Sequence, residues 1–506
     1  MTRKKKMLFN TSVSLAYQII TMVCGFILPR LILSYFGSEI NGLVSSITQF
    51  LSFISLAECG VGAVVQSALY KPLAEKDHDE ISRIIISAER FFRKLALLLL
   101  VYTVILMFIY PLITIGSFDY FFTSSLILVI SISSFAQYYF SMSYRLLLSA
   151  DQMAFVQLGL QSIILVLNTI ISVLLMKIGT GIHIVKLASS VIFLIQPLGL
   201  TVYVKRHYNL NKKLVLTEEP IKQKWNGLAQ HIASVVLGNT DTIVLTLFST
   251  LQNVSIYAVY NLVVDGVKKI MMSSTTGMQA MLGNMYAKKE SNTLNRTFSF
   301  LEWLLHTLTV FAFSCTGILI LPFMKVYTAN ITDVNYCVPI FAVLITLAQA
   351  AYCLRLPYNM MVLAAGHYKQ TQASAIIEMM INIILSVALV NKFGLIGVSI
   401  GTLLAMAYRT IYLAWYLKNN ILYRDFKHFI KHIFVDIITV LLVIMATEWI
   451  DLNVTNYVLW IKEAIIVALI AMSIIMIVNL VFYYGFLIQL FKTIIGHVKN
   501  DKDKIF

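Results

Sequence analysis

Charged residues are scarce in this chain of 506 residues. Asp, Glu, Lys and Arg make up 12% of the sequence against 59% hydrophobic residues, and the mean hydropathy is +0.81. No soluble arrangement could bury so much apolar surface, so the surrounding solvent must be a lipid bilayer. The apolar runs are continuous over about 20 residues, which is typical of membrane helices rather than of the shorter alternating strands of a barrel.

Motifs for catalysis and cofactor binding are also missing. The sequence has no G-x-x-x-x-G-K-[ST] phosphate loop, no nucleophile elbow and no His and Cys spacing typical of a metal site. The cysteines lie in or beside apolar runs without a C-x-x-C pair, and we interpret them as small core residues: Cys24, Cys59, Cys315, Cys337 and Cys353. We therefore expect no ATP hydrolysis, no enzyme activity and no cofactor.

Basic residues outnumber acidic ones and give a formal net charge of +15. The basic segment 1–6 leads into an apolar run over 8–33, which is too long for a signal-peptide core and is interpreted as a retained first span. With a cytoplasmic N-terminus, most Lys and Arg fall on the cytoplasmic side, which is the positive-inside pattern. We expect both termini to be cytoplasmic and anionic lipid headgroups, not nucleic acid, to attract this charge.

Apolar windows of about 20 residues predict an all-α, polytopic membrane protein with 14 transmembrane helices. The predicted spans are 8–33, 41–70, 90–112, 120–145, 154–176, 182–204, 227–248, 254–284, 298–324, 335–363, 371–391, 395–417, 430–450 and 458–490. The longest hydrophilic connection, Lys205 to Trp225, follows the sixth span. It is the expected linker between two six-helix lobes.

An internal repeat supports this division. The sequence Asn168-Thr-Ile-Ile-Ser-Val recurs as Asn382-Ile-Ile-Leu-Ser-Val. The two copies of this motif are 214 positions apart. Two loop motifs recur at nearly the same separation, 74–77 as 287–290 after 213 positions and 149–151 as 364–366 after 215. Six spans per copy give both copies one orientation, so the pseudo-twofold axis runs along the membrane normal, as in many secondary transporters. The predicted domains are an N-lobe with its linker over 1–226, a C-lobe over 227–418 and two extra C-terminal helices over 419–506.

Polar residues form stripes on the first two helices of each copy. The eighth span is the richest, with Tyr257, Asn261, Asp265 and Lys268 at helical spacing along one face. We expect the first, second, seventh and eighth spans to line a hydrated central cavity between the copies. The alternative is that their uncharged polar residues hydrogen-bond neighbouring helices.

Charges inside the spans are costly, at about 2.5 to 3.5 kcal/mol each in a lipid-facing helix, so they should face protein or water. Asp265 stands three and four residues before Lys268 and Lys269 and can pair with both, leaving one cation in excess. Arg355, Arg409 and Glu378 can form a structural ion-pair network in the second copy.

Two acids have no obvious partner within a few residues of them in the sequence, and one arginine lies near a span end. Glu58 and Asp241 can bind a coupling cation or pair with Lys268 or Arg30. Arg30 follows Pro29 near the outer end of the first span, so it can also extend to the outer headgroups.

Several motifs resemble a known family over almost the whole chain. They are Gly37-Ser-Glu-Ile-Asn-Gly-Leu, Leu56-Ala-Glu-Cys-Gly-Val-Gly, Asn239-Thr-Asp-Thr-Ile-Val, Gly283-Asn-Met-Tyr-Ala-Lys and Arg355-Leu-Pro-Tyr-Asn followed by Ala364-Ala-Gly-His-Tyr-Lys. With the 6+6+2 plan, they resemble the multidrug/oligosaccharidyl-lipid/polysaccharide exporter superfamily and, within it, the polysaccharide-export branch. The first span has one arginine where the lipid II flippase branch carries several basic residues, which favours the former branch.

The resemblance implies a V-shaped pair of six-helix lobes that flips a lipid-linked oligosaccharide in the bacterial cytoplasmic membrane. The substrate would be an undecaprenyl-diphosphate-linked glycan or a teichoic-acid precursor, moved to the outer leaflet by alternating access. The implied binding residues are Arg30, Lys268 and Lys269, with Arg355, Arg409, Asn261 and Tyr257 in support. Candidates for coupling to H⁺ or Na⁺ are Asp241, Glu58, Asp265 and Glu378. The polysaccharide polymerase machinery is a further expected partner.

Other functions remain open at this point. A multidrug or small-cation exporter of the same fold would favour an acidic, aromatic cavity. A membrane polymerase or acyltransferase would need a catalytic site, and a non-catalytic scaffold for the polymer machinery would tolerate the loss of every buried charge.

Overall fold

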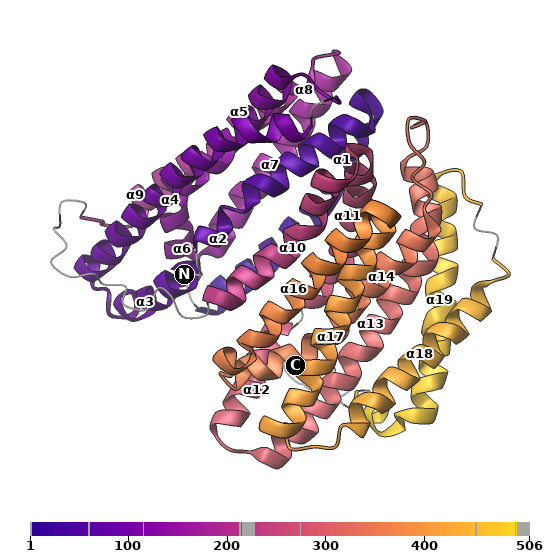
Figure 1. Cartoon of the computed structure of the whole chain (residues 1–506). Coiled ribbons are helices and arrows are strands. Elements are labelled where there is room, and N and C mark those ends of the chain that lie inside the picture. The colour runs from indigo at the N-terminus through magenta and orange to yellow at the C-terminus, as the bar shows by residue number, and fades with distance from the viewer. Residues whose placement is uncertain are drawn as a thin grey trace, which may run out of the picture. The chain divides into compact units, whose positions relative to one another are not determined.

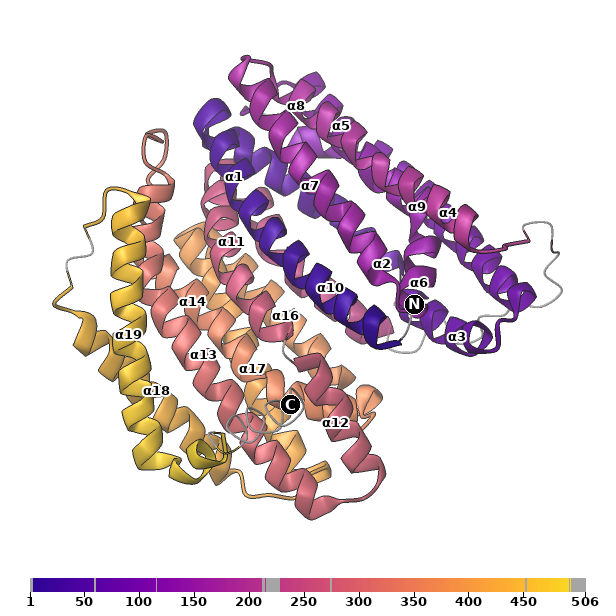
Figure 2. The same ribbon diagram turned by 180° about the vertical axis from the view of Figure 1, so that it is seen from behind.

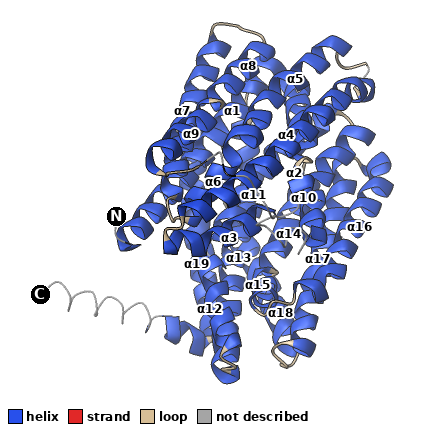
Figure 3. Cartoon of the chain, turned by 90° about the vertical axis from the view of Figure 1, so that its left-hand side faces the viewer, coloured by secondary structure: helices blue, strands red, loops and turns tan. Residues whose placement is uncertain are grey.

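The computed structural model describes residues 3–58, 61–114, 116–211, 214, 228–273, 275–450, 453–490 and 492. All regular secondary structure in these ranges is helical, with no strand (Figure 3). Twelve helical segments in the same ranges are long and apolar enough to cross a membrane. The prediction of an all-α, multi-pass membrane protein is therefore confirmed.

The chain forms two compact units, residues 1–258 and 259–506. The first contains α1 (Arg3–Ser52), α2 (Ser55–Glu58), α3 (Val61–Glu75), α4 (His78–Ile113), α5 (Tyr120–Ala136), the π-helix η1 (Gln137–Ser141), α6 (Met142–Ala150), α7 (Ala154–Lys177), α8 (Ile182–Phe193), α9 (Ile195–His207) and α10 (Leu228–Phe248). In this unit α7 packs along α1 (Figure 1, Figure 2). The next helix, α11 (Leu251–Ser273), begins in the first unit and ends in the second.

The second unit continues with α12 (Thr275–Ala287), α13 (Ser291–Tyr327), α14 (Pro339–Leu354), α15 (Leu356–Ala364), α16 (Tyr368–Phe393), α17 (Leu395–Asn420), α18 (Lys427–Thr447) and α19 (Tyr457–Phe482). Helices α16 and α17 form its most extensive pair, and α18 and α19 pack on α13 (Figure 1).

The helices follow the predicted spans closely. For example, 154–176 becomes Ala154–Lys177 and 371–391 becomes Tyr368–Phe393. The last predicted span reaches residue 490; α19 ends at Phe482, and the backbone is helical again over 484–490 after a break at Tyr483. Tyr483 leaves helical geometry there, with φ −138° and ψ 32°.

The predicted count of 14 spans differs from the twelve segments for two visible reasons. Helix α1 runs through the predicted boundary between the first two spans, but it is kinked at Gly37, whose φ of 83° and ψ of 175° suit glycine alone. Helices α11 and α12 are absent from the twelve, since α11 carries the charged polar stripe. The count of 14 and the lobe boundaries stay predictions, and most of the predicted linker over 205–225 lies outside the described residues.

The repeated Asn/Ser motif serves helix packing in the second unit. Asn382 on α16 donates a hydrogen bond to Oγ1 of Thr402 on α17 at 3.0 Å, and both are buried. One turn further, a Cβ on Gly401 would lie 2.6 Å from Oγ of Ser386. Small side chains thus let α16 and α17 approach closely, as in many membrane helix pairs.

The cysteines fit the core interpretation in part. Cys24 and Cys353 are buried, Cys315 and Cys337 are half-buried, and all four are free. Cys59 lies outside the described residues.

Candidate functional site

Three charges on α11 form the ion pairs expected from their spacing. Nζ of Lys268 lies 2.6 Å from Oδ1 of Asp265, and Nζ of Lys269 lies 2.8 Å from Oδ2. The Lys268 and Asp265 side chains are largely covered, whereas the Lys269 side chain is 74% exposed. One carboxylate thus faces two cations, so this helix carries one unbalanced positive charge.

A second group of charges is buried where three helices meet. Arg355 stands between α14 and α15, Glu378 lies on α16 and Arg409 lies on α17. Arg355 pairs with Oε1 of Glu378, while Nη1 of Arg409 lies 3.3 Å from Oε2. The predicted ion-pair network is confirmed, and it also carries one positive charge in excess.

Arg409 retains an unused donor. Its side chain is 6% exposed, and its Nε makes no hydrogen bond within the described part of the chain. A buried guanidinium N–H without an acceptor costs free energy that an incoming oxyanion would recover.

Tyr352 on α14 connects the two groups. Nζ of Lys268 lies 5.2 Å from the centroid of its ring, and Cζ of Arg355 lies 4.3 Å from the same centroid. Both distances are typical of cation–π contacts. We call this assembly the cationic cluster; it consists of Asp265, Lys268, Lys269, Tyr352, Arg355, Glu378 and Arg409.

Four cations and two carboxylates give the cationic cluster an excess of two positive charges. Guanidinium and ammonium groups are the side chains that bind phosphate oxygens best. Four of the seven predicted binding residues, Lys268, Lys269, Arg355 and Arg409, are therefore brought together. Asn261 lies on α11, one turn before Asp265, and is half-buried.

The remaining predicted residues lie in the first unit. Tyr257 donates a hydrogen bond from its hydroxyl to Oδ2 of Asp241 at 2.9 Å, and both residues are buried. Arg30 lies on α1 directly after Pro29 and is half-buried. The predicted cavity between the two copies involves both units and stays a prediction.

Glu58, at the end of α2, has three charged or titratable neighbours, His231, Arg145 and Tyr138. Nε2 of His231 contacts the carbonyl oxygen of Ser55 at 2.9 Å. Arg145 also lines a cavity of about 330 Å³ together with Ser55 and Tyr138. Sequence reasoning missed Arg145, because it stands at the very end of a predicted span and resembled an ordinary loop charge.

Lys186 on α8 was also missed. It lines a cavity of about 370 Å³ with Asn168 and Ser172 of the repeated motif and with several further hydroxyl side chains. The motif in the first unit thus borders open space. Among the described residues, no group of three or more His, Cys, Asp or Glu could hold a metal ion.

The sequence matches no protein family and no curated protein. The structure does resemble solved structures. A lipid II flippase, MurJ, in an inward closed conformation superposes with a TM-score of 0.72 at 17% identity, covering 95% of this chain and all of that one. An inward-facing multidrug resistance MATE family transporter of the MOP superfamily gives 0.61 at 14% identity, covering 80% and 98%. The chain has the fold of the MOP superfamily.

Another MATE transporter, VcmN of Vibrio cholerae, gives a TM-score of 0.52 at 13% identity and covers 84% of this chain and 96% of that one. The MOP fold predicted from the motifs is therefore confirmed. Identities this low establish the fold, whereas the substrate has to be argued from the residues of this chain.

Proposed function

We propose that this MOP-fold protein is a secondary transporter that flips an undecaprenyl-diphosphate-linked oligosaccharide or a teichoic-acid precursor across the bacterial cytoplasmic membrane. The cationic cluster is the observation that carries this proposal. Each phosphate of a prenyl diphosphate bears a negative charge, so the headgroup matches the two excess positive charges of the cluster. The glycan would then serve the synthesis of a cell-surface polysaccharide.

The proposed transport follows alternating access, with 14 spans in two six-helix repeats plus two further helices and both termini in the cytoplasm. The diphosphate neutralises the cationic cluster, while the prenyl chain stays in lipid. Arg30, Asn261 and Tyr257 are proposed to contribute further contacts. Asp241, Glu58, Asp265 and Glu378 stay candidates for a coupling cation. Similarity to a lipid II flippase supports a lipid-linked substrate in general.

The ion pairs allow a test that removes only the excess charge. In a K269Q/R409Q variant, Asp265 keeps Lys268 and Glu378 keeps Arg355, so both carboxylates stay paired. Binding of undecaprenyl diphosphate to the purified protein in lipid nanodiscs should weaken at least about tenfold, the effect of losing one charged hydrogen bond of 1.5 kcal/mol or more. Undecaprenyl monophosphate should bind the wild type more weakly than the diphosphate does.

Lys392 offers a matched control, because it is an exposed lysine on α16 whose ammonium lies 5.5 Å from the ring centroid of Phe393, outside the cationic cluster. K392Q should bind undecaprenyl diphosphate like the wild type. In cells lacking their own polysaccharide flippase, the wild type and K392Q should restore glycan export, and K269Q/R409Q should not. Full binding and export by K269Q/R409Q at normal membrane levels would refute the proposal.

A multidrug exporter is the second candidate. It is supported by the similarity to MATE transporters and by the buried carboxylate of Asp241 beside an aromatic hydroxyl, a suitable pair for a cation. This candidate predicts that the wild type makes a sensitive strain resistant to cationic drugs and that D241N does not. Unchanged drug sensitivity with the wild type would exclude it.

A further inference from the structure

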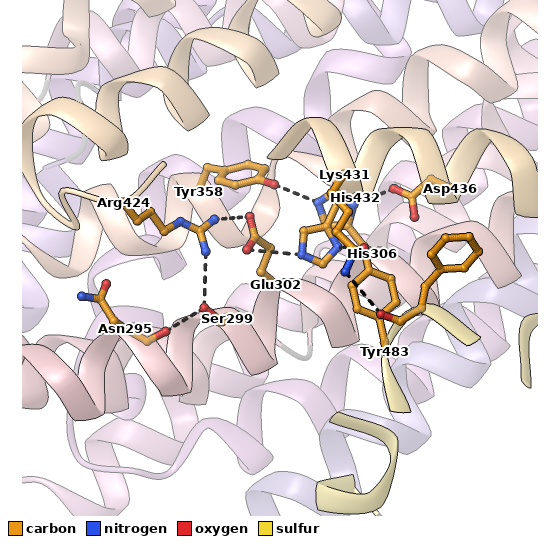
Figure 4. Close-up of polar contacts among 11 residues, drawn as sticks. Asn295, Ser299, Glu302, His306, Tyr358, Arg424, Lys431, His432, Asp436 and Tyr483 are labelled. Atoms are coloured by element: carbon orange, nitrogen blue, oxygen red, sulfur yellow. Dashed lines mark hydrogen bonds and ion pairs between the residues drawn. The ribbon is translucent and has the colours of Figure 1, made fainter. Parts of the chain in front are cut away.

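A second polar assembly lies in the second unit, which also contains the cationic cluster. Its histidines and carboxylates lie on α13 and α18, which the cationic cluster does not use, and its arginine lies in the connection between α17 and α18. It contains two carboxylates, two imidazoles and one guanidinium, and we call it the histidine–carboxylate cluster: Glu302, His306, Arg424, His432 and Asp436 (Figure 4). Glu302 and His306 are one turn apart on α13, as are His432 and Asp436 on α18. Two pairs at a spacing of four residues thus face each other across the contact between α13 and α18.

One end of this cluster is centred on Glu302, whose side chain is 0% exposed. Its Oε1 pairs with Arg424, and its Oε2 lies 3.5 Å from Nε2 of His432. Arg424 also donates a hydrogen bond from Nη1 to Oγ of Ser299 at 3.4 Å.

The other end is centred on His306, whose side chain is 1% exposed. Nδ1 of His306 lies 2.6 Å from Oδ2 of Asp436, and Nε2 lies 3.0 Å from the hydroxyl of Tyr358 on α15. The Tyr358 hydroxyl also interacts with Glu302, so it connects the two ends.

The break at the end of α19 completes the assembly. Tyr483, the first residue after that helix, places its hydroxyl 2.9 Å from Nδ1 of His432, and the two rings stack with centroids 5.0 Å apart. The imidazoles of His306 and His432 are also 5.0 Å apart, centroid to centroid. A continuous chain of titratable groups therefore runs from Asp436 through both histidines to Tyr483 (Figure 4).

The charges of this cluster balance only with an added proton. Glu302 and Asp436 supply two negative charges, and Arg424 supplies one positive charge. The nearby Lys431 is exposed and directs its ammonium to the Tyr483 ring and the carbonyl of Phe482. One protonated imidazole makes the five-residue cluster neutral, and histidine is the side chain that gains and loses a proton near neutral pH.

His306 can accept that proton with little rearrangement. In its neutral form, Nδ1–H donates to Asp436, and Nε2 accepts from the Tyr358 hydroxyl. A proton entering on the Nε2 lone pair turns this nitrogen into a donor, so the Tyr358 hydroxyl must rotate toward Glu302. The imidazolium then forms a buried, charge-assisted hydrogen bond with Asp436.

We propose that the histidine–carboxylate cluster is the binding site of the coupling proton, with His306 as the acceptor and Asp436 as its counter-charge. The inference rests on the proposed transport function and identifies its coupling ion. The imidazole nitrogens already contact carboxylates and hydroxyls of the chain, so they have no position left for a metal ion. They can still gain or lose a hydrogen, and we therefore identify the ligand as a proton. Loading and unloading alter the attraction between α13 and α18, which couples protonation to helix movement.

The test replaces the proton site by an uncharged pair of similar shape, H306Q/D436N. The amides preserve hydrogen bonding between α13 and α18 but cannot hold a proton. His367, whose Nδ1 contacts the Tyr416 hydroxyl at 2.9 Å, provides the matched control H367Q. Both variants should reach the membrane at wild-type levels, and a double variant that fails to fold is replaced by D436N alone, which leaves His306 without its counter-charge.

The first readout needs no glycan. Infrared difference spectra of the purified protein in nanodiscs between pH 8 and pH 5 contain bands from all nine histidines. The component of an imidazolium hydrogen-bonded to a carboxylate should be present in the wild type and H367Q and absent from H306Q/D436N. An unchanged imidazolium–carboxylate component in H306Q/D436N would refute the site even if transport is established.

The second readout is transport of fluorescent undecaprenyl-diphosphate disaccharide in proteoliposomes. A pH gradient should accelerate the wild type and H367Q at least fivefold and leave H306Q/D436N at its basal rate. Acceleration by a sodium gradient in place of the pH gradient would overturn the proton assignment. Absence of any transport by the wild type would instead refute the proposed function and leave the spectroscopic result standing.

Discussion

Arg409 contacts Oε2 of Glu378 at 3.3 Å, although Arg355 already neutralises that carboxylate. Two guanidinium groups thus share one buried acid. A structural ion pair alone would need only one of them. The additional cation is what distinguishes the cationic cluster from a neutral network and makes it suitable for an anionic headgroup.

Removing the shared acid should destabilise the second unit. E378Q leaves both guanidinium groups without a carboxylate, and breaking a buried ion pair on one side costs about 3–5 kcal/mol. The thermal unfolding midpoint in detergent should therefore fall clearly. A second substitution, E378Q/R409Q, removes one of the stranded cations and should recover part of the loss. An unchanged midpoint in E378Q would show that solvent reaches this site.

The hydroxyl of Tyr257 supports the Asp241 carboxylate in the first unit. Y257F removes a hydrogen bond to a charged group at 2.9 Å and should lower the free energy of unfolding by about 1.5–3 kcal/mol. The same substitution in a D241N background should cost less, because the acceptor is then neutral. A double-mutant cycle of chemical denaturation measures this difference, and equal losses in both backgrounds would contradict the pairing.

The contact between α16 and α17 should be intolerant of one methyl group. A Cβ on Gly401 would lie 2.6 Å from Oγ and 2.9 Å from N of Ser386, so G401A forces the helices apart and should cost about 1–3 kcal/mol. Gly238 on α10 is the control, because a Cβ there meets nothing within 4 Å. G238A should be neutral or slightly stabilising. Equal melting of G401A and the wild type would show that the pair is loosely packed.

Local patterns predicted the helices well, because the hydropathy and polar spacing of a span depend only on about 20 neighbouring residues. The same local spacing predicted the pairing of Asp265 with Lys268 and Lys269, three and four residues apart. The kink at Gly37 coincides with the predicted boundary between the first two spans. The break at Tyr483 was not predicted, since it is a change of backbone conformation inside an otherwise apolar run.

The histidine–carboxylate cluster could not be predicted from local sequence patterns. Its partners are far apart along the chain, as Arg424 stands 122 residues after Glu302 and Asp436 stands 130 residues after His306. Only tertiary packing brings them together. The sequence does contain a signal of this cluster, because two predicted spans each carry an acid and a histidine four residues apart. Each pair taken alone, however, is no different from polar residues buried for structural reasons.

Lys186 provides a final test, of a cation whose cavity has no carboxylate among the described residues that line it. The residues that line its cavity of about 370 Å³ include hydroxyls and the Asn168 amide but no carboxylate. A lysine inside a membrane helix costs up to about 2.5–3.5 kcal/mol, so K186M should raise the unfolding midpoint. The exposed Lys177 at the end of α7 gives the control K177M, which should leave the midpoint unchanged. A lower midpoint in K186M would mean that the ammonium is stabilised by hydration or by an anion in the cavity. If K186M is more stable, as expected, Lys186 does not serve stability. We then expect it to serve substrate binding, so glycan export by K186M should fall.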